Sequence, residues 1–444
     1  MSYTKKNKTK TKNSSRYKTK KHTKKITKIS KKHNSSQQKT LRIIFEHSPS
    51  LENDATIYKN KFIKQGYKVD FKLIRSVLHI NNTKNKEPYY DVNLFLEILP
   101  FKCKIFFPAK TNLFMPNNEL FIDTKEDNKK QSKYNRYKEL KSIDYVLCKT
   151  KLCHTFFNFI KNERKNNMKY SYIYKYQTVY TKFTSSINKD ILQIVDKDNY
   201  SDSNSNSDSL IDPNLFIHLA GKSPFKNTPD LVHCWIKNKG FLDIDPDIKL
   251  VITCYEHCSK WFNKTLIRFY KYDFEKDPDV IMNSKNNTAT YKNMTIYFKS
   301  ITPYSDFIDI ITKANVSICI SNKEGYGHYI NESRYMKKFI ITLDYPPMNE
   351  LVIDKDVKNG SGGNGIVLKN KNKFIKQTYK ETKFNFNEAY PDSDDLRDSI
   401  IWCIKHKHEL RKWGKNGRQM FLDDKKYFED KMDNLIKLIK LINL

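Results

Sequence analysis

Two glutamates eight positions apart, Glu324 and Glu332, carry the clearest chemical signal in this chain. Gly325 and Gly327 follow the first of them, and the apolar run 316–320 before it is typical of a buried parallel strand. Glycines let backbone approach a ligand closely, a helix N-terminus favours an anion, and carboxylates accept hydrogen bonds from hydroxyl groups. This pattern therefore suits a polyhydroxylated ligand that carries phosphate.

The segment EGYGHYINE (324–332) resembles the signature of family 4 retaining glycosyltransferases, enzymes of the GT-B class. The later segment DYPPMNELV (344–352) is similar to that family's strand end, turn and helix with a further Glu. The resemblance implies that Glu332 accepts hydrogen bonds from the ribose of a nucleotide-sugar donor. It also implies that Glu324 lies beside the transferred sugar. The implied donor-binding set is Gly325, Tyr326, Gly327, His328, Tyr329, Glu332 and Glu350.

Two of these residues keep a second interpretation. His328 stands where many family members carry an aliphatic residue, so it either contacts the sugar or packs as an aromatic-like residue. Glu350 either belongs to the donor site or is an exposed residue of a helix.

Departure of a nucleoside diphosphate requires positive charge beside the leaving group. Lys222 and Lys226 lie in the loop after the apolar run 214–220 and resemble the pair of cations that grips the diphosphate in the same family. The alternative is two solvated loop lysines. This chain departs from the family pattern in having Lys222 where Arg is common and Asn227 where Gly is common. Lysine still neutralises phosphate as a point charge. The expected catalytic residues are thus Glu324, Lys222 and Lys226.

Metal assistance would require an Asp-x-Asp type of ligand set. Such patterns occur in 242–247, 196–198 and 354–356. The first precedes a strand at its amino end, where α/β folds do not bind ligands, and the others lie in polar, charge-rich surroundings. We therefore expect no metal and no cofactor, with the nucleotide-sugar acting as a substrate.

Short apolar runs alternate with helical stretches along most of the chain, which predicts an α/β fold of two Rossmann-like domains facing a cleft. The expected strands are 41–46, 67–74, 92–98, 103–108, 143–149, 214–220, 248–255, 294–298, 316–320 and 339–344. The expected domains are a disordered Lys-rich tail (1–40), an N-terminal acceptor domain (41–197), a polar linker or loop (198–210), a C-terminal donor domain (211–391) and C-terminal helices (392–444).

The acceptor side has weaker signals. The loop after the first expected strand lacks glycine, and His47 is its one chemical candidate, with a plain turn residue as the alternative. Loops at the ends of later strands add further candidates that point to no particular acceptor, whether glycan, protein or lipid. They are Asn117, Glu119, Lys149 and Thr150.

Charge is concentrated at the start of the chain. The 444 residues have a net charge of +33, and residues 1–40 hold 15 Lys or Arg and no Asp or Glu. Such a segment has too few apolar residues to fold, and it favours contact with an anionic membrane or nucleic acid, or a solubilising role. The alternative function is accordingly a non-catalytic GT-B-like protein that binds nucleic acid or an acidic partner through this tail.

The chain shows no apolar signal-peptide core and no apolar run of 18 residues or more. Its eight cysteines are scattered, without a second pair at zinc-ribbon spacing. We therefore expect a cytoplasmic protein with reduced cysteines.

Overall fold

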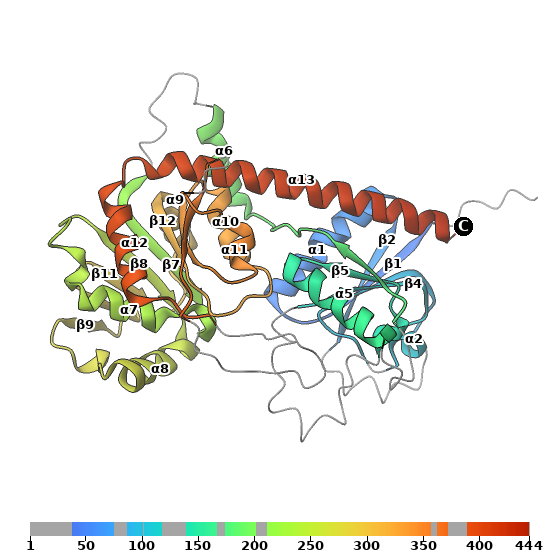
Figure 1. Cartoon of the computed structure of the whole chain (residues 1–444), viewed down its shortest axis with the longest axis horizontal. Helices are drawn as coiled ribbons and strands as arrows, with labels where there is room; N and C mark the ends of the chain where they lie inside the picture. The colour runs from blue at the N-terminus through green and yellow to red at the C-terminus, as the bar shows by residue number, and fades with distance from the viewer. Residues whose placement is uncertain are drawn as a thin grey trace, which may run out of the picture. The chain divides into compact units, whose positions relative to one another are not determined.

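The computed structural model describes residues 38–74, 87–100, 102–117, 139–166, 174–200, 211–356, 362–371 and 389–443. Two β-sheets organise these residues into two halves (Figure 1). The predicted α/β class with two Rossmann-like sheets is confirmed. The predicted Lys-rich tail lies outside the described residues up to position 37, and strand β1 begins at Thr40.

The first sheet has the strand order β2-β1-β3-β4-β5-β6, and all its neighbouring strands run parallel. Its buried apolar strands pack against helices on both faces, as a parallel sheet requires. The strands are β1 (Thr40–Glu46), β2 (Lys68–Ile74), β3 (Tyr90–Leu96), β4 (Ala109–Met115), β5 (Tyr145–Cys148) and β6 (Gln177–Tyr180). The helices are α1 (Pro49–Lys64), α2 (Cys103–Phe106), η2 (Leu140–Ser142) and α5 (Lys151–Asn166).

The second sheet has the order β14-β13-β12-β7-β8-β11-β10-β9 and is parallel except for the antiparallel hairpins at β9, β10 and β11. Its strands are β7 (Asp212–Gly221), β8 (Lys249–Cys254), β9 (Val280–Asn283), β10 (Thr288–Tyr291), β11 (Met294–Tyr297), β12 (Ala314–Cys319), β13 (Phe339–Leu343) and β14 (Gly365–Leu368). The helices of this half are α6 (Lys189–Tyr200), η4 (Pro224–Lys226), α7 (Thr228–Lys237), η5 (Lys239–Phe241), α8 (Glu256–Thr265), η6 (Leu266–Tyr270), η7 (Phe274–Lys276), α9 (Tyr304–Lys313), α10 (His328–Tyr335), α11 (Met348–Leu351) and α12 (Ser393–Lys405).

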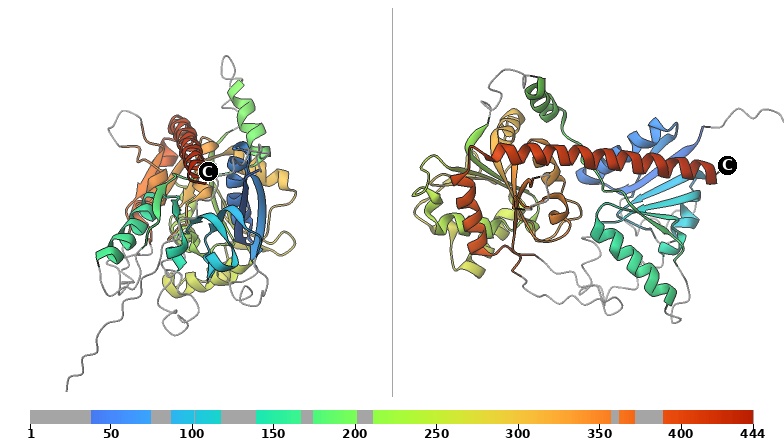
Figure 2. Two further views of the ribbon diagram at one scale, coloured as in Figure 1. Left: turned by 90° about the vertical axis from the view of Figure 1, so that its right-hand side faces the viewer. Right: turned by 45° about the horizontal axis from the view of Figure 1, so that its top comes forward.

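The C-terminal helix α13 (Leu410–Ile442) runs along both halves (Figures 1 and 2). Near its start, Gly414 lets the helix lie against the second half, because an added Cβ would sit 1.9 Å from the carbonyl oxygen of Lys337. Farther along, Asp433 pairs with Lys61 of α1 at 3.0 Å. The helix therefore joins elements of both sheets.

One predicted strand is wrong. Residues 103–108 were expected to form a strand, but 103–106 form helix α2, and the strand β4 follows it. Cys103 and Phe107 are buried while Ile105 is exposed, which is the spacing of a helix face. Short apolar runs do not distinguish the two structures by periodicity alone.

Two more features were not expected from the sequence. Strands β6, β9, β10 and β14 were missed, because each has only four residues. Helix α8 ends at Thr265 and is followed directly by the π-helical turn η6. Among the described residues, no helix has the length and apolar character needed to cross a membrane.

Candidate functional site

The loops after β7 and β12 lie next to each other, because these two strands are neighbours in the second sheet. The loop after β12 leads through Gly327 into α10, as the sequence predicted. Gly327 is the N-cap residue and has a φ of +100°, a conformation that glycine adopts without strain. Parallel sheets bind ligands at this carboxyl edge, so the two loops define a candidate site.

Lys226 and Glu324 meet in this site. The Lys226 ammonium forms an ion pair with Glu324 Oε1, which also accepts a hydrogen bond of 2.6 Å from Ser321. The same ammonium lies 3.5 Å from the centre of the Tyr329 ring. Both charged side chains are 12% exposed, so a ligand can reach a cation and an anion that are held side by side.

Glu332 lies one turn into α10 and is partly buried. Within the described part of the chain, its carboxylate has no hydrogen-bond or ion-pair partner. Burial raises its pKa, although the neighbouring His328 and Lys226 lower it. Buried polar groups are rarely left without a partner, so this carboxylate has acceptor capacity for a ligand.

The other members of the predicted donor set have mixed roles. The Tyr326 hydroxyl donates to the carbonyl of Phe183 and accepts a hydrogen bond from Asn331 at 2.8 Å, so this buried side chain is a packing residue. The Tyr329 hydroxyl lies 2.5 Å from Ser321 Oγ. Lys222 is exposed and has no hydrogen bond or ion pair with another described residue.

Gly325 brings the two halves into contact. A Cβ added here would lie 2.2 Å from Oδ1 of Asn117, a residue that follows β4 of the first sheet. The predicted acceptor-side residue Asn117 therefore lies against the loop that carries Glu324.

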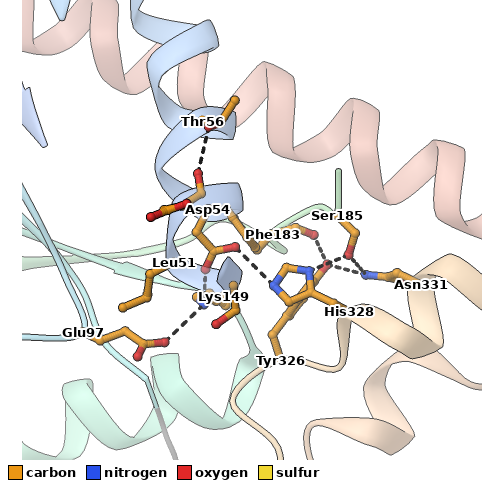
Figure 3. Close-up of polar contacts among 12 residues, drawn as sticks. Leu51, Asp54, Thr56, Glu97, Lys149, Phe183, Ser185, Tyr326, His328 and Asn331 are labelled. Atoms are coloured by element: carbon orange, nitrogen blue, oxygen red, sulfur yellow. Dashed lines mark hydrogen bonds and ion pairs between the residues drawn. The ribbon is translucent and has the colours of Figure 1, made fainter. Parts of the chain in front are cut away.

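A buried polar network continues this contact (Figure 3). His328 Nε2 lies 3.1 Å from Asp54 Oδ1, and His328 Nδ1 lies 2.9 Å from Ser185 Oγ. Lys149 donates to Asp54 Oδ2 at 2.7 Å and lies 3.9 Å from Glu97. In the close-up, Asp54 of α1 stands between Lys149 and His328. His328 is thus held by the first half while its side chain stays 29% exposed.

The two carboxylates of the network have opposite pKa shifts. Burial would raise the pKa of Asp54, but Lys149 and His328 outweigh it and lower the pKa. Burial raises the pKa of Glu97, and Lys149 compensates only partly. The ionised form is therefore stabilised by the surroundings at Asp54 and disfavoured by them at Glu97.

The remaining sequence candidates lie around this network. Thr150 caps helix α5 by accepting a hydrogen bond of 3.1 Å from the Cys153 amide. Glu350 accepts hydrogen bonds from the amides of Lys151 and Leu152 at 2.7 and 3.0 Å. It therefore binds the N-terminus of α5, a role that its motif did not indicate.

The last two acceptor-side candidates are not among the residues that contact this network in the described part of the chain. His47 is 76% exposed and pairs with Glu52 at 2.6 Å. Glu119 lies outside the described residues.

The sequence interpretation missed Asp54, Glu97 and Ser185. Asp54 lies in the first helix after β1, and no local motif marks it. Glu97 carried the one usable signal, an acidic residue at the carboxyl end of an apolar strand segment.

Among the described residues, no group of three or more His, Cys, Asp or Glu side chains is arranged to hold a metal ion. The candidate Asp245 of the 242–247 segment instead binds Lys407 at 2.5 Å, before the start of β8.

The fold matches solved GT-B glycosyltransferases. Sucrose-phosphate synthase from Thermosynechococcus elongatus aligns with a TM-score of 0.54 and 10% identity, covering 91% of this chain and all of that one. The α,α-trehalose 6-phosphate synthase from Burkholderia multivorans aligns with a TM-score of 0.52 and 8% identity, covering 91% and 97%. No protein-family model matches the sequence, and no curated protein does. The two structural alignments show that the chain has the GT-B fold, which confirms the predicted fold class.

Proposed function

We propose that the protein is a retaining glycosyltransferase that moves a sugar from a nucleoside-diphosphate donor to an acceptor hydroxyl without a metal ion. The observation that carries the proposal is the Lys226–Glu324 ion pair near the carboxylate of Glu332, for which the described residues supply no hydrogen-bond or ion-pair partner. The GT-B fold supports it, although a fold alone does not establish an activity.

Each side chain has a role in this proposal. Glu332 accepts hydrogen bonds from the ribose hydroxyls, which gives its carboxylate the partners that the described residues do not supply. Lys226, together with the exposed Lys222, neutralises the diphosphate as the bond to the sugar breaks. When Lys226 turns to phosphate, Glu324 becomes free to bind sugar hydroxyls or to stabilise positive charge at the anomeric carbon. The backbone amides of 326–329 face the sugar and phosphate oxygens.

A thermal-shift screen of UDP, GDP, ADP and their sugar conjugates tests the donor site. A ligand that binds only the folded state stabilises it by about 2.7 kcal/mol at a hundredfold excess over its dissociation constant. We expect selective stabilisation by one nucleotide family and its loss in Glu332→Gln. Asp309→Asn, which changes an exposed carboxylate of α9, serves as the control.

The Glu332→Gln variant should also remain folded. Because burial raises the pKa of Glu332, its ionised form costs stability as the pH rises through that pKa. Glutamine removes this cost, so the melting temperature at neutral pH should be unchanged or higher. An undiminished nucleotide shift in this folded variant would rule out Glu332 as the ribose ligand.

Binding of an anionic membrane or nucleic acid by residues 1–40 stays a prediction, since residues 1–37 lie outside the described part of the chain.

A further inference from the structure

The acceptor hydroxyl has to approach from the first half. In a productive complex the reacting atoms lie roughly 3–3.5 Å apart. Under the proposed function, the anomeric carbon lies beside Glu324 and His328. Among the described residues, the side chains from the part of the chain before α6 that contact this loop include Asn117 at Gly325, Asp54 and Ser185 at His328, and Phe183, whose ring lies against His328.

The charged side chains at the carboxyl edge of the first sheet differ in how closely they are paired. Lys149 and Asp54 are 4% and 2% exposed and bind each other at 2.7 Å, so each neutralises the other. Glu97 is different. Its side chain is 17% exposed, and its carboxylate lies 3.9 Å from Lys149, beyond hydrogen-bonding distance.

The position of Glu97 is also unusual. It follows β3 with a φ of +61°, in the left-handed region that side-chain-bearing residues rarely adopt. Its carboxylate hydrogen-bonds Asn117, which lies against Gly325. The backbone thus places an acidic side chain one contact away from the loop that holds Glu324.

We propose that Glu97 binds the hydroxyl groups of the acceptor and that the acceptor is an uncharged carbohydrate. This inference rests on the proposed function. A carboxylate accepts hydrogen bonds from hydroxyls, whereas it repels a phosphate or carboxylate at short range. Lys149, the lysine that lies 3.9 Å from Glu97, is already neutralised by Asp54.

A charge series on one sugar scaffold tests the proposal. The probes are glucosamine, glucose, glucuronate and glucose 6-phosphate, offered with the donor that the thermal-shift screen identifies. The readout is the probe-dependent release of nucleoside diphosphate, compared as a ratio between probes within each variant. We expect glucose to exceed both anionic probes at least tenfold in the wild type. Glu97→Lys should reverse this order, and the isosteric Glu97→Gln should bring the ratio close to one.

Asp398→Lys makes the same charge change on the exposed face of α12 and should leave the wild-type order intact. The proposal would be overturned if the wild type preferred an anionic probe or responded to no probe. It would also be overturned if the order of the probes were the same in the wild type and in both Glu97 variants. Failure of the proposed function has another signature, since then no nucleotide would shift the melting temperature of the wild type.

Discussion

Replacement of Asp54 by alanine should destabilise the protein strongly. Asp54 is 2% exposed and is the 2.7 Å partner of Lys149, which is 4% exposed. Removing one partner of a buried ion pair typically costs about 3–5 kcal/mol, because the other charge stays buried. Glu97 at 3.9 Å compensates Lys149 only in part. We therefore expect a loss of about 3 kcal/mol in the free energy of unfolding.

Urea denaturation of a double-mutant cycle measures this effect. The second substitution, Lys149→Met, removes the ammonium but keeps an apolar side chain of similar length. Because the double variant leaves no uncompensated ammonium, it should be more stable than Asp54→Ala alone. A loss below about 1 kcal/mol for Asp54→Ala, or strictly additive effects of the two substitutions, would show that the pair is not coupled.

The same cycle has a pH dependence with a defined sign. The folded state lowers the pKa of Asp54 below its ordinary value of 3.8, since Lys149 and His328 outweigh burial. Its contribution is therefore present above that ordinary value and is lost as the pH falls through the lower folded value. The stability difference between wild type and Asp54→Ala should narrow only in strong acid. A stability difference that already narrows between about pH 7 and pH 5 would show that a group other than the Asp54 carboxylate is responsible, since ordinary carboxylates titrate below this range.

Two further substitutions test the contacts between the halves. Gly325→Ala places a Cβ 2.2 Å from Asn117 Oδ1, so denaturation should show a loss of about 1–3 kcal/mol. Asn117→Ala should relieve part of that loss, and an equal loss in both backgrounds would contradict the contact. Glu350→Gln removes the charge at the N-terminus of α5, so hydrogen exchange of the Lys151 and Leu152 amides should accelerate and stability should fall by about 1 kcal/mol. Unchanged exchange at both amides would show that Glu350 does not hold this helix end.

The course of the loop that carries Glu324 was predictable because its signals are local. A buried strand, two glycines and a helix start follow one another within 316–332, and the structure has β12, the Gly327 cap and α10 in that order. The ion pair between Lys226 and Glu324 was not predictable, since the two residues are 98 positions apart and only the pairing of β7 with β12 brings their loops together.

The first half was harder to predict for a physical reason. The segment 103–115 has two apolar runs, and periodicity alone did not decide which of them is the strand. Asp54 and Ser185 contribute to the network through contacts to His328 that span more than a hundred residues. No local pattern encodes such contacts. The sequence therefore indicated the parallel sheet of the first half, but not which of its side chains contact His328.

The loop 324–328 is positioned from both sides, and this bears on how the proposed site is formed. Its second residue, Gly325, lies against Asn117, and its last residue, His328, is held by Asp54 and Ser185. Glu324 at the start of the loop is held by Lys226 and Ser321 of the second half. A ligand that withdraws Lys226 from Glu324 therefore acts on a loop whose other end is fixed by the first half. The motif 324–332 is local in sequence, but the geometry of the proposed donor site depends on residues of both halves.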